Sequence, residues 1–306
     1  MGIVTAIELA WWLIVWRLGI APVPHLLTYV ALAFLGLAAA IGVRLALKLP
    51  TTAIPWPTVL IAAVLVGIGA SAFLPLKYAI PNEIGFWLDK PLALAERQLF
   101  GADPWVLLDR LLGSATVPMD WLYGCWMPVQ TLALFSLILS RPSPAKSQAL
   151  IAYSLAWFLL GVVAAVLLSS AGPIFYDRLY GGGDFHALNA MLRECGAWFA
   201  ISESDLMWAS RSDSSPGIVA GMSAMPSIHV AISLWIYLAA RQMLPKAAPV
   251  ALGYFLLIWV GSVQLGWHYL ADGLVGAVGM LAVWKLAKLI QLKADRAADV
   301  PNVHTD

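Results

Sequence analysis

Apolar runs long enough to cross a lipid bilayer as helices recur along the sequence, and they restrict the possible folds more than any other feature. A membrane-spanning helix needs roughly 20 apolar residues. Of the 306 residues, 61% are hydrophobic and 11% are charged, and the mean hydropathy is +0.82, above the usual range of a water-soluble domain. We therefore expect an all-α, polytopic membrane protein. The eight expected spans cover residues 3–20, 28–47, 57–76, 118–140, 149–171, 226–242, 249–266 and 268–290.

The first expected span differs from the others because it contains Glu8 and Arg17. This segment could instead lie in the membrane interface as an amphipathic helix. We expect residues 1–56 to contribute accessory membrane helices, and residues 57–291 to form a six-helix membrane core. The polar residues 292–306 are predicted to form a disordered cytoplasmic tail.

The basic residues near the spans predict the orientation of the chain, because short cytoplasmic loops carry an excess of Lys and Arg. The short loops on one side and the C-terminal segment contain Arg44, Lys48, Arg141, Lys146, Arg241, Lys246, Lys285, Lys288, Lys293 and Arg296. We therefore expect this side and the C-terminus to be cytoplasmic, in the plasma (inner) membrane. Residues 77–117 and 172–225 should face outward. Within them, residues 82–113 have the pattern of amphipathic interface helices, and residues 186–195 that of a short helix.

The stretch Pro-Ser-Ile-His at residues 226–229 places polar groups at the start of an apolar run. Proline lacks an amide hydrogen, so Pro226 suits the first turn of a helix. The free N–H groups of such a helix start, together with the Ser227 hydroxyl and the His229 ring, favour a bound anion. The stretch therefore predicts a phosphate pocket at the outer end of this span.

A second polar pair, His268 and Asp272, stands at the start of the last span. Their spacing of four residues places both on one face of a helix. An aspartate inside a span is costly without a partner. Asp272 could hold the hydrogen on one ring nitrogen of His268 and leave the other nitrogen to attack, as the base is oriented in catalytic triads. A single histidine near an interface is usually structural, but two such motifs at one membrane face favour a catalytic site.

Pro-Ser-Ile-His followed by His-Tyr-Leu-Ala-Asp, with 38 residues between the two histidines, resembles the second and third motifs of the type 2 phosphatidic acid phosphatase superfamily. The motifs are most similar to the inositolphosphotransferase branch that contains fungal inositol phosphorylceramide synthase and, more distantly, the sphingomyelin synthases. The resemblance covers roughly residues 57–290. It implies a reaction without metal or cofactor in which His268 forms a phosphohistidine and Asp272 orients it. His229 would protonate the leaving alkoxide, and Ser227 would bind the phosphate.

Two departures from the superfamily pattern concern the groups that bind phosphate. Superfamily phosphatases carry an arginine six residues before the nucleophilic histidine, where this chain has Ser262. The first motif, a lysine seven residues before an Arg-Pro pair, is also absent, as it is in the sphingolipid-synthase branch. Arg178 occupies the place of the missing motif and is the first candidate replacement, and Arg193 is the second. Arg178 could equally pair with a neighbouring acid or a lipid headgroup.

The expected function is therefore cleavage or transfer of a phosphoryl or phospho-headgroup unit on a lipid phosphoester at the outer face. Water as the acceptor makes the protein a phosphatase, and an alcohol such as ceramide, diacylglycerol or a sugar makes it a transferase. The sequence does not distinguish these acceptors. The net charge of +1 without a basic stripe argues against a nucleic-acid partner.

Two alternatives stay open from the residues alone. A zinc hydrolase could use His229, His268 and Asp272 as ligands, although the sequence has no His-Glu-x-x-His motif. A lipid transporter or scramblase could line a path with intramembrane charges such as Asp120. Transport predicts polar residues through the whole bilayer depth, whereas the catalytic candidates gather at one face.

Overall fold

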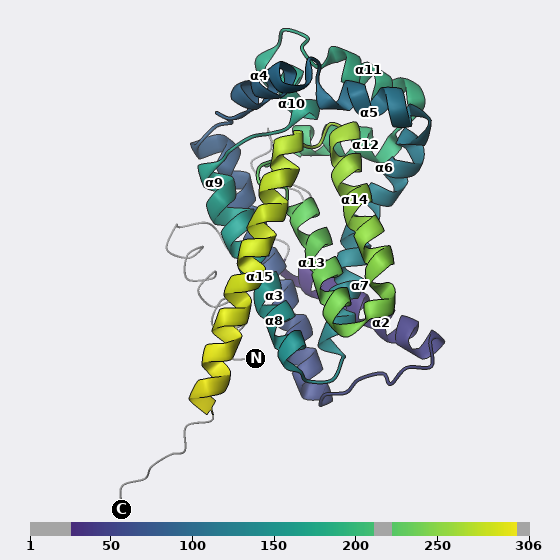
Figure 1. Ribbon diagram of the computed structural model, residues 1–306, viewed down its shortest axis with the longest axis vertical. Helices are drawn as coiled ribbons and strands as arrows, with labels where there is room; N and C mark the ends of the chain where they lie inside the picture. Colours follow the sequence, from purple (N-terminus) through teal and green to yellow (C-terminus); the bar gives the residue numbers. More distant parts are fainter. Residues whose placement is uncertain (1–25, 211–221, 299–306) are drawn as a thin grey trace, which may run out of the picture.

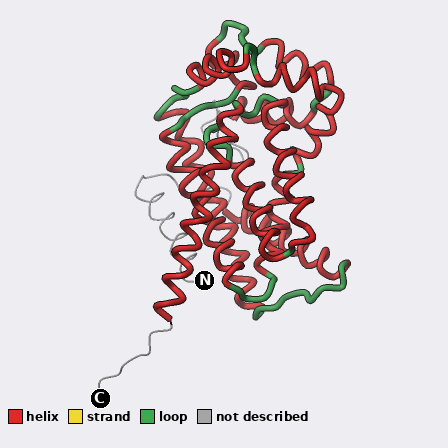
Figure 2. Tube along the Cα trace, viewed as in Figure 1, coloured by secondary structure: helices red, strands yellow, loops and turns green. Residues whose placement is uncertain are grey.

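The computed structural model describes residues 26–210 and 222–298, and every regular element in these two ranges is a helix (Figure 2). The expected all-α fold is therefore confirmed. Long helices run along the long axis of the molecule, and shorter helices form a cap over one end (Figure 1). The expected span at residues 3–20, with Glu8 and Arg17, lies outside the described residues.

The long helices pack side by side around a central helix, which is α13. Trp235 of α13 is 1% exposed, and its indole nitrogen donates to the Ala149 carbonyl of α8 at 2.8 Å. Helix α13 also packs against α7, α14 and α15, and α2 packs against α3 and α7. The bounds of these helices are α2 Leu26–Ala46, α3 Trp56–Glu83, α7 Trp126–Ile138, α8 Pro144–Phe158, α13 Ile228–Met243, α14 Ala248–Gln264 and α15 Leu270–Ala298.

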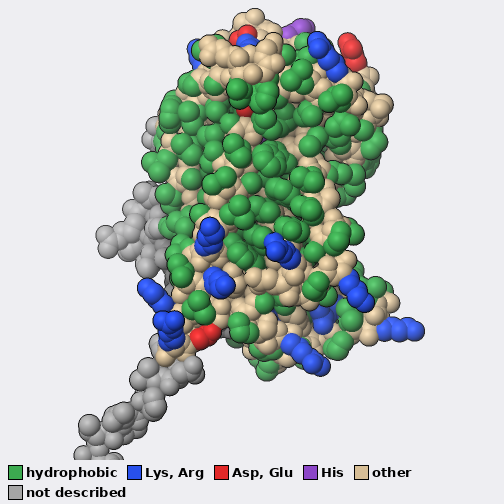
Figure 3. Space-filling model, viewed as in Figure 1, with side chains coloured by type: hydrophobic (Ala, Val, Ile, Leu, Met, Phe, Trp, Pro, Cys, Tyr) green, Lys and Arg blue, Asp and Glu red, His purple; other side chains and the backbone are tan. Residues whose placement is uncertain are grey.

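Within the described residues, four helical stretches are long and apolar enough to cross a membrane. A fifth is added when a bent pair of segments is counted as one span. The face of the bundle seen in Figure 3 is largely hydrophobic along its middle, as lipid contact requires. The four stretches are Leu26–Ala46, Pro144–Leu167, Pro245–Gln264 and Leu270–Arg296.

The expected span at 118–140 is not one straight helix. The structure has a helical segment Pro104–Gly124 followed by Trp126–Ile138, with a bend of 43° between them. Pro128 lies in the first turn of the second segment and has no N–H to donate to the Gly124 carbonyl four residues earlier. The helical hydrogen-bond pattern is therefore interrupted at the bend, which lies beside the candidate site.

Short helices form the cap at one end of the bundle (Figure 1). The expected interface helices within residues 82–113 and the expected helix at 186–195 are all present. Arg97 links two parts of the cap through ion pairs to Asp103 at 2.6 Å and Asp184 at 3.0 Å. The cap helices are α4 Asp89–Phe100, α5 Pro104–Leu112, α6 Thr116–Gly124, α10 Pro173–Tyr180, α11 His186–Cys195 and α12 Trp198–Ser210.

Two helix ends differ from the sequence-based expectations. Helix α15 continues to Ala298, so the prediction of disorder from residue 292 is wrong for its first seven residues; the remainder, 299–306, lies outside the described residues. Helix α13 begins at Ile228 with Ser227 as its N-cap, so Pro226 precedes the first turn and does not form part of it. A serine oxygen can accept a backbone N–H at a helix start, and this favours Ser227 over Pro226 as the boundary.

Candidate active site

His268 and Asp272 lie together at the turn that begins α15. Asp272 Oδ2 is 3.5 Å from His268 Nδ1 and accepts a hydrogen bond from the Tyr269 backbone N–H at 2.9 Å. His268 is 4% exposed and Asp272 is fully buried. The 3.5 Å separation is longer than an ordinary hydrogen bond, as is common for catalytic pairs without substrate. With Nδ1 facing Asp272, Nε2 is the nitrogen on the other side of the ring.

The start of α13 is joined to the same turn. The Ser227 N–H donates to the Asp272 carbonyl at 3.0 Å, and Ser227 Oγ accepts from the Val230 N–H at 3.3 Å. This close approach requires glycine in α15, because a Cβ on Gly276 would lie 2.4 Å from the Ser227 carbonyl oxygen. The two sequence motifs therefore meet through their backbones.

His229 projects from the first turn of α13 into an aromatic environment. Its ring centroid lies 4.2 Å from that of Trp126 and 5.1 Å from that of Tyr123, with the Tyr123 ring nearly parallel. The Trp126 indole N–H also donates to the His229 carbonyl at 3.1 Å. The centroids of the His229 and His268 rings are 5.8 Å apart. The structure thus brings Ser227, His229, His268 and Asp272 into one cluster.

Residues 169–174, a connecting segment outside the two sequence motifs, form hydrogen bonds to the chain just before each motif. Ser170 accepts two hydrogen bonds from the loop residues just before Pro226. Its carbonyl accepts from the Ala224 N–H at 2.7 Å, and its Oγ accepts from the Met225 N–H at 3.1 Å. The Ser-Ser-Ala-Gly-Pro stretch at 169–173 has the composition of a turn, but its sequence does not indicate these partners. Ser170 therefore fixes the position of the first motif.

The same segment also fixes the second motif. The Ile174 N–H donates to the Gly266 carbonyl at 2.8 Å, two residues before His268. Gly172 has a φ of 99°, and a Cβ there would lie 2.3 Å from the Trp267 carbonyl oxygen. Only glycine accepts both this backbone conformation and this contact readily.

Asp89 in the cap holds the connecting segment by its backbone. Its carboxylate accepts from the Ala171 N–H at 3.0 Å and the Gly172 N–H at 3.1 Å, and from the Tyr180 hydroxyl at 3.1 Å. Burial raises the pKa of Asp89 from 3.8 to about 6. In the sequence, this aspartate has the appearance of a solvated residue on an interface helix, so its structural role was not predicted.

Glu96, about two turns after Asp89 in α4, caps the helix that carries Asp272. Its Oε1 accepts from the Ala271 N–H at 2.8 Å, and the residue is 6% exposed. Burial raises the pKa of Glu96 from 4.5 to about 7, and the negative charge of Asp272 adds to this rise. A carboxylate at a helix N-terminus is favoured by the helix dipole. Glu96 therefore stabilises the turn that carries His268 and Asp272, and no local sequence pattern distinguishes it.

Arg178 and Arg193 lie together at α12. Arg178 pairs with Asp205, contacts the Ser204 carbonyl and lies over the Trp208 ring, with 5.8 Å from its guanidinium carbon to the ring centroid. Arg193 pairs with the same Asp205 at 3.4 Å. Both arginines thus have an acid partner in the cap, whereas the serine, histidines and aspartate of the cluster are held by α13 and α15.

Ser262 provides backbone support where superfamily phosphatases have an arginine. Its carbonyl accepts from the His268 N–H at 3.1 Å, and its Oγ donates to the Trp259 carbonyl at 2.7 Å. The residue is fully buried. Ser262 therefore positions His268 and carries no positive charge toward a phosphate.

Two structural findings bear on the alternatives. The part of the chain that the structure describes contains no group of three or more His, Cys, Asp or Glu placed to hold one metal ion. Asp120 is 1% exposed and accepts from the Phe199 and Ala200 N–H groups, each at 2.8 Å. Asp120 therefore caps α12 and is engaged with backbone, which does not favour a role in lining a path.

Comparison with known proteins yields one match. A family model described as the PAP2 superfamily matches residues 91–286, which is more than half of the chain and includes every residue of the cluster. No curated protein and no solved structure matches the chain. The matched region begins inside α4 and ends within α15, so it includes the connecting segment at 169–174 as well as both motifs. The chain belongs to the PAP2 superfamily.

Proposed function

We propose that this protein cleaves or transfers a phosphoryl or phospho-headgroup unit on a lipid phosphoester, with His268 as a covalent nucleophile. The observation that carries the proposal is the proximity of the two imidazoles: their centroids are 5.8 Å apart, and Asp272 Oδ2 lies 3.5 Å from Nδ1 of His268. Membership of the PAP2 superfamily supports phosphatase or phosphotransferase chemistry on lipid phosphoesters in general.

In the first step, the lone pair on Nε2 of His268 attacks phosphorus while the bond from phosphorus to the leaving alkoxide breaks. The alkoxide takes the proton that His229 carries, and Asp272 stabilises the positive charge that develops on His268. In the second step, water or an alcohol gives a proton to His229 as its oxygen attacks phosphorus. The phosphorus–nitrogen bond breaks, and both histidines return to their starting states.

The phosphate would lie at the N-terminal end of α13, where backbone N–H groups favour an anion. Ser227 Oγ accepts a hydrogen bond from Val230, and its own hydrogen can be donated to a phosphate oxygen. The buried position of His268 and Asp272 limits competition from water and strengthens these electrostatic contacts. This arrangement supports a site that binds the phosphate at the bundle end beneath the cap.

Arg178 is proposed as the cationic phosphate ligand, with Arg193 as the second candidate. Helix α10, which carries Arg178, begins at the segment bonded to Gly266, so its position is coupled to that of His268. Arg178 would exchange Asp205 for the phosphate when substrate binds. We expect Arg178→Lys to keep part of the turnover and Arg178→Ala little, because lysine keeps the charge and loses the two-pronged contact; unchanged kinetics in Arg178→Ala would move this role to another residue.

Within the superfamily, we propose an inositolphosphotransferase-like activity of the sphingolipid-synthase type, or a lipid phosphate phosphatase. The form of the His-Tyr-Leu-Ala-Asp motif and the serine at position 262 support the first of these. We also propose that the site faces the extracytoplasmic side of the plasma (inner) membrane and that the C-terminus is cytoplasmic. The basic loops at the opposite end of the bundle support this orientation.

The direct test is incubation of the purified protein with a panel of lipid phosphoesters, with and without candidate alcohol acceptors, followed by mass spectrometry of the products. We expect a released or transferred phospho-unit with at least one lipid, and its loss in a folded His268→Ala variant. An exchange product that appears with an alcohol would identify a transferase, and release into water alone would identify a phosphatase. Full turnover by His268→Ala would contradict the proposal.

A further inference from the structure

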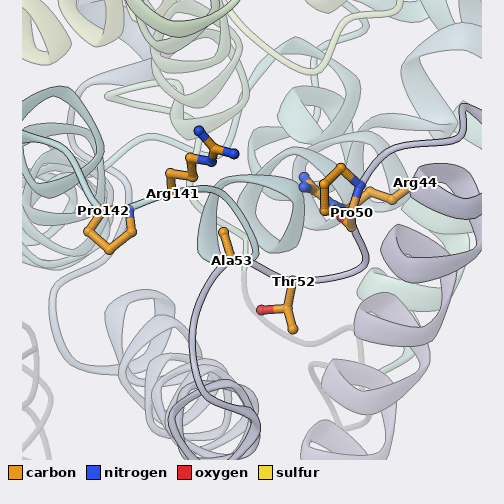
Figure 4. Close-up of a pocket in the computed structure, with 6 residues that line it drawn as sticks. All are labelled: Arg44, Pro50, Thr52, Ala53, Arg141 and Pro142. Atoms are coloured by element: carbon orange, nitrogen blue, oxygen red, sulfur yellow. The ribbon is translucent and has the colours of Figure 1, made fainter.

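The bundle end opposite the cap contains an open cavity of about 710 Å³ (Figure 4). It lies between the loop that joins α2 to α3 and the turn that joins α7 to α8. This volume is within the range of pockets that hold small ligands or headgroups. The cavity is lined by Arg44, Pro50, Thr52, Ala53, Arg141 and Pro142.

The two arginines reach the cavity from different elements, as Figure 4 shows. Arg44 belongs to the last turn of α2, and its Nε donates to the Pro50 carbonyl at 2.7 Å. This bond fixes the plane of the guanidinium group and uses only one of its five N–H bonds. Arg141 follows α7 and is exposed. The cavity therefore has two fork-shaped donors on separate walls.

The positive charge at the cavity is not balanced by nearby carboxylates. Residues 47–55 and 139–143 contain no Asp or Glu, and within the described residues neither arginine forms an ion pair. Lys146 adds a third positive charge within electrostatic range of Arg44. Its ammonium group donates to the Ile138 and Ser140 carbonyls at 2.6 and 2.8 Å, both neutral groups.

The walls of the cavity are held in place by backbone and side-chain hydrogen bonds. The Ala53 N–H donates to the Leu139 carbonyl at 3.0 Å and thus joins the two lining loops. Thr52 Oγ1 both donates to the Ile54 carbonyl at 2.9 Å and accepts from the Ile54 N–H at 3.1 Å. The arginines are therefore attached to a rigid frame, which lowers the entropic cost of binding a ligand.

We propose that this cavity binds an anionic phosphate group, either that of a lipid headgroup or free inorganic phosphate. Guanidinium forks match phosphate oxygens in two-pronged contacts, and basic pockets at the ends of membrane helices suit anionic headgroups. The site is separate from the histidine cluster, because its elements lie at the far end of the bundle from the cap (Figure 1). Its function would be to anchor the protein or to sense an anionic ligand.

The test compares two variants that each lose two positive charges at the same end of the bundle. Arg44→Gln/Arg141→Gln removes the cavity donors. Lys285→Gln/Lys288→Gln removes exposed charges of α15 that do not line the cavity. Both are prepared in phosphate-free neutral detergent, and their helix content is verified by circular dichroism. The single variant Arg141→Gln, in an exposed turn, is included in case the double replacement does not fold.

Native mass spectrometry then counts bound molecules during titration with phosphatidylglycerol, with inorganic phosphate, and with oleate as an anion without phosphate. We expect the cavity variant to bind the phosphate-bearing probe about tenfold more weakly than the lysine variant, and oleate to bind both alike. Weaker binding of both phosphate probes by the cavity variant would show that the cavity recognises the phosphate group itself. Loss with phosphatidylglycerol only assigns a lipid, and loss with inorganic phosphate only assigns the free ion.

Equal binding of both phosphate probes by the arginine and lysine variants would overturn the proposal. An equal loss in the lysine variant would also overturn it, because it would reveal general attraction to a basic surface. Anion binding at the histidine cluster is common to all variants and cancels in the comparison. The binding comparison does not depend on turnover, so its outcome stands even if the proposed catalytic function fails its own test.

Discussion

His229 and His268 have different surroundings, which agrees with the different roles proposed for them. His268 is almost fully buried beside Asp272, whereas His229 is half-buried between the rings of Trp126 and Tyr123. An oriented, desolvated imidazole suits attack on phosphorus. A half-buried imidazole with access to water can exchange a proton between turnovers.

Replacing His229 should therefore affect substrates according to their leaving groups. We expect His229→Ala to slow single-turnover cleavage of a natural lipid phosphoester by roughly 10² to 10⁴, the usual contribution of a positioned general acid. The defect should be much smaller with a nitrophenyl phosphoester, whose leaving group departs without a proton. Rapid-quench rates with both substrates measure this, and a defect of equal size would leave His229 as a phosphate ligand only.

Glu96 provides a prediction about pH. Burial raises its pKa from 4.5 to about 7, so between these values the folded protein retains a proton that the unfolded chain has released. Stability should therefore fall as pH rises through this window. Glu96→Gln removes the contribution, so its Tm minus that of the wild type should increase from about pH 5 to about pH 7.5.

The matched control is Glu194→Gln, which makes the same change at an exposed position of α11. Its Tm difference from the wild type is measured over the same pH range and gives the effect of losing a glutamate carboxyl at an exposed position. Asp89, whose pKa burial also raises, is present in all three proteins and cancels. A flat Tm difference for Glu96→Gln would show that the Glu96 carboxyl does not titrate in this window.

At the scale of the helices, the site depends on how closely α13 and α15 approach. Gly276 makes this possible, since a Cβ would lie 2.4 Å from the Ser227 carbonyl oxygen. Gly253 in α14 has no atom within 4 Å of the equivalent position. Alanine is the better helix former by about 1 kcal/mol, so helix propensity alone predicts that both replacements stabilise.

We therefore expect Gly276→Ala to lower both Tm and turnover, with a loss of turnover of about 10²-fold from displacement of the α13 start. Gly253→Ala should leave turnover unchanged and keep or slightly raise Tm. Thermal unfolding and steady-state rates on both variants measure this. Wild-type turnover in Gly276→Ala would show that the catalytic cluster does not require this close approach.

The sequence predicted the elements that carry strong periodic or compositional signals. The helix at 186–195 and the interface helices within 82–113 are present. The apolar runs at 28–47, 149–171, 249–266 and 268–290 correspond to helices that are long and apolar enough to cross a membrane, whereas the run at 3–20 lies outside the described residues. The bend near Gly124 cannot be recognised from hydropathy because the apolar run continues across it, whereas the structure interrupts the helix where Pro128 lacks an N–H. Helix α13 begins at Ile228, two residues later than the expected start at Pro226, because the capping preference of Ser227 outweighs the preference of proline for the first turn.

The site was predictable only where its residues form compact motifs. Ser227, His229, His268 and Asp272 could be grouped from two short stretches. Asp89, Glu96 and Ser170 could not, because their partners are backbone N–H groups about 55 to 175 residues away in the chain. Such contacts depend on tertiary packing and leave no local pattern in the sequence.

At the scale of the whole molecule, charge and hydropathy divide the protein into a cap, an apolar middle and a basic end. Lys and Arg gather at the end of the bundle opposite the cap (Figure 3). By the positive-inside rule, this end should be cytoplasmic and the cap should be outside. The histidine cluster and the proposed anion site would then face opposite aqueous compartments.

Cysteine labelling tests this orientation. In a Cys125→Ser background, Cys195 of α11 is exposed in the cap and should react with a membrane-impermeant maleimide on intact cells. In a Cys125→Ser/Cys195→Ser background, a thiol introduced by Lys293→Cys near the end of α15 should react only after permeabilisation. The reverse pattern would place the cap in the cytoplasm and contradict the proposed sidedness.

The central claim is that His268 becomes covalently phosphorylated during turnover. The most direct measurement is peptide mapping of protein quenched in alkali, which preserves phosphohistidine, after brief mixing with an activated phosphoester. The account predicts a phospho-unit on the peptide that contains His268, and its absence in His268→Ala. It also predicts that the adduct still forms in His229→Ala, because an activated leaving group needs no proton donor. Product formation in the wild-type protein with no adduct in any quench interval, or with the adduct on another residue, would contradict the account.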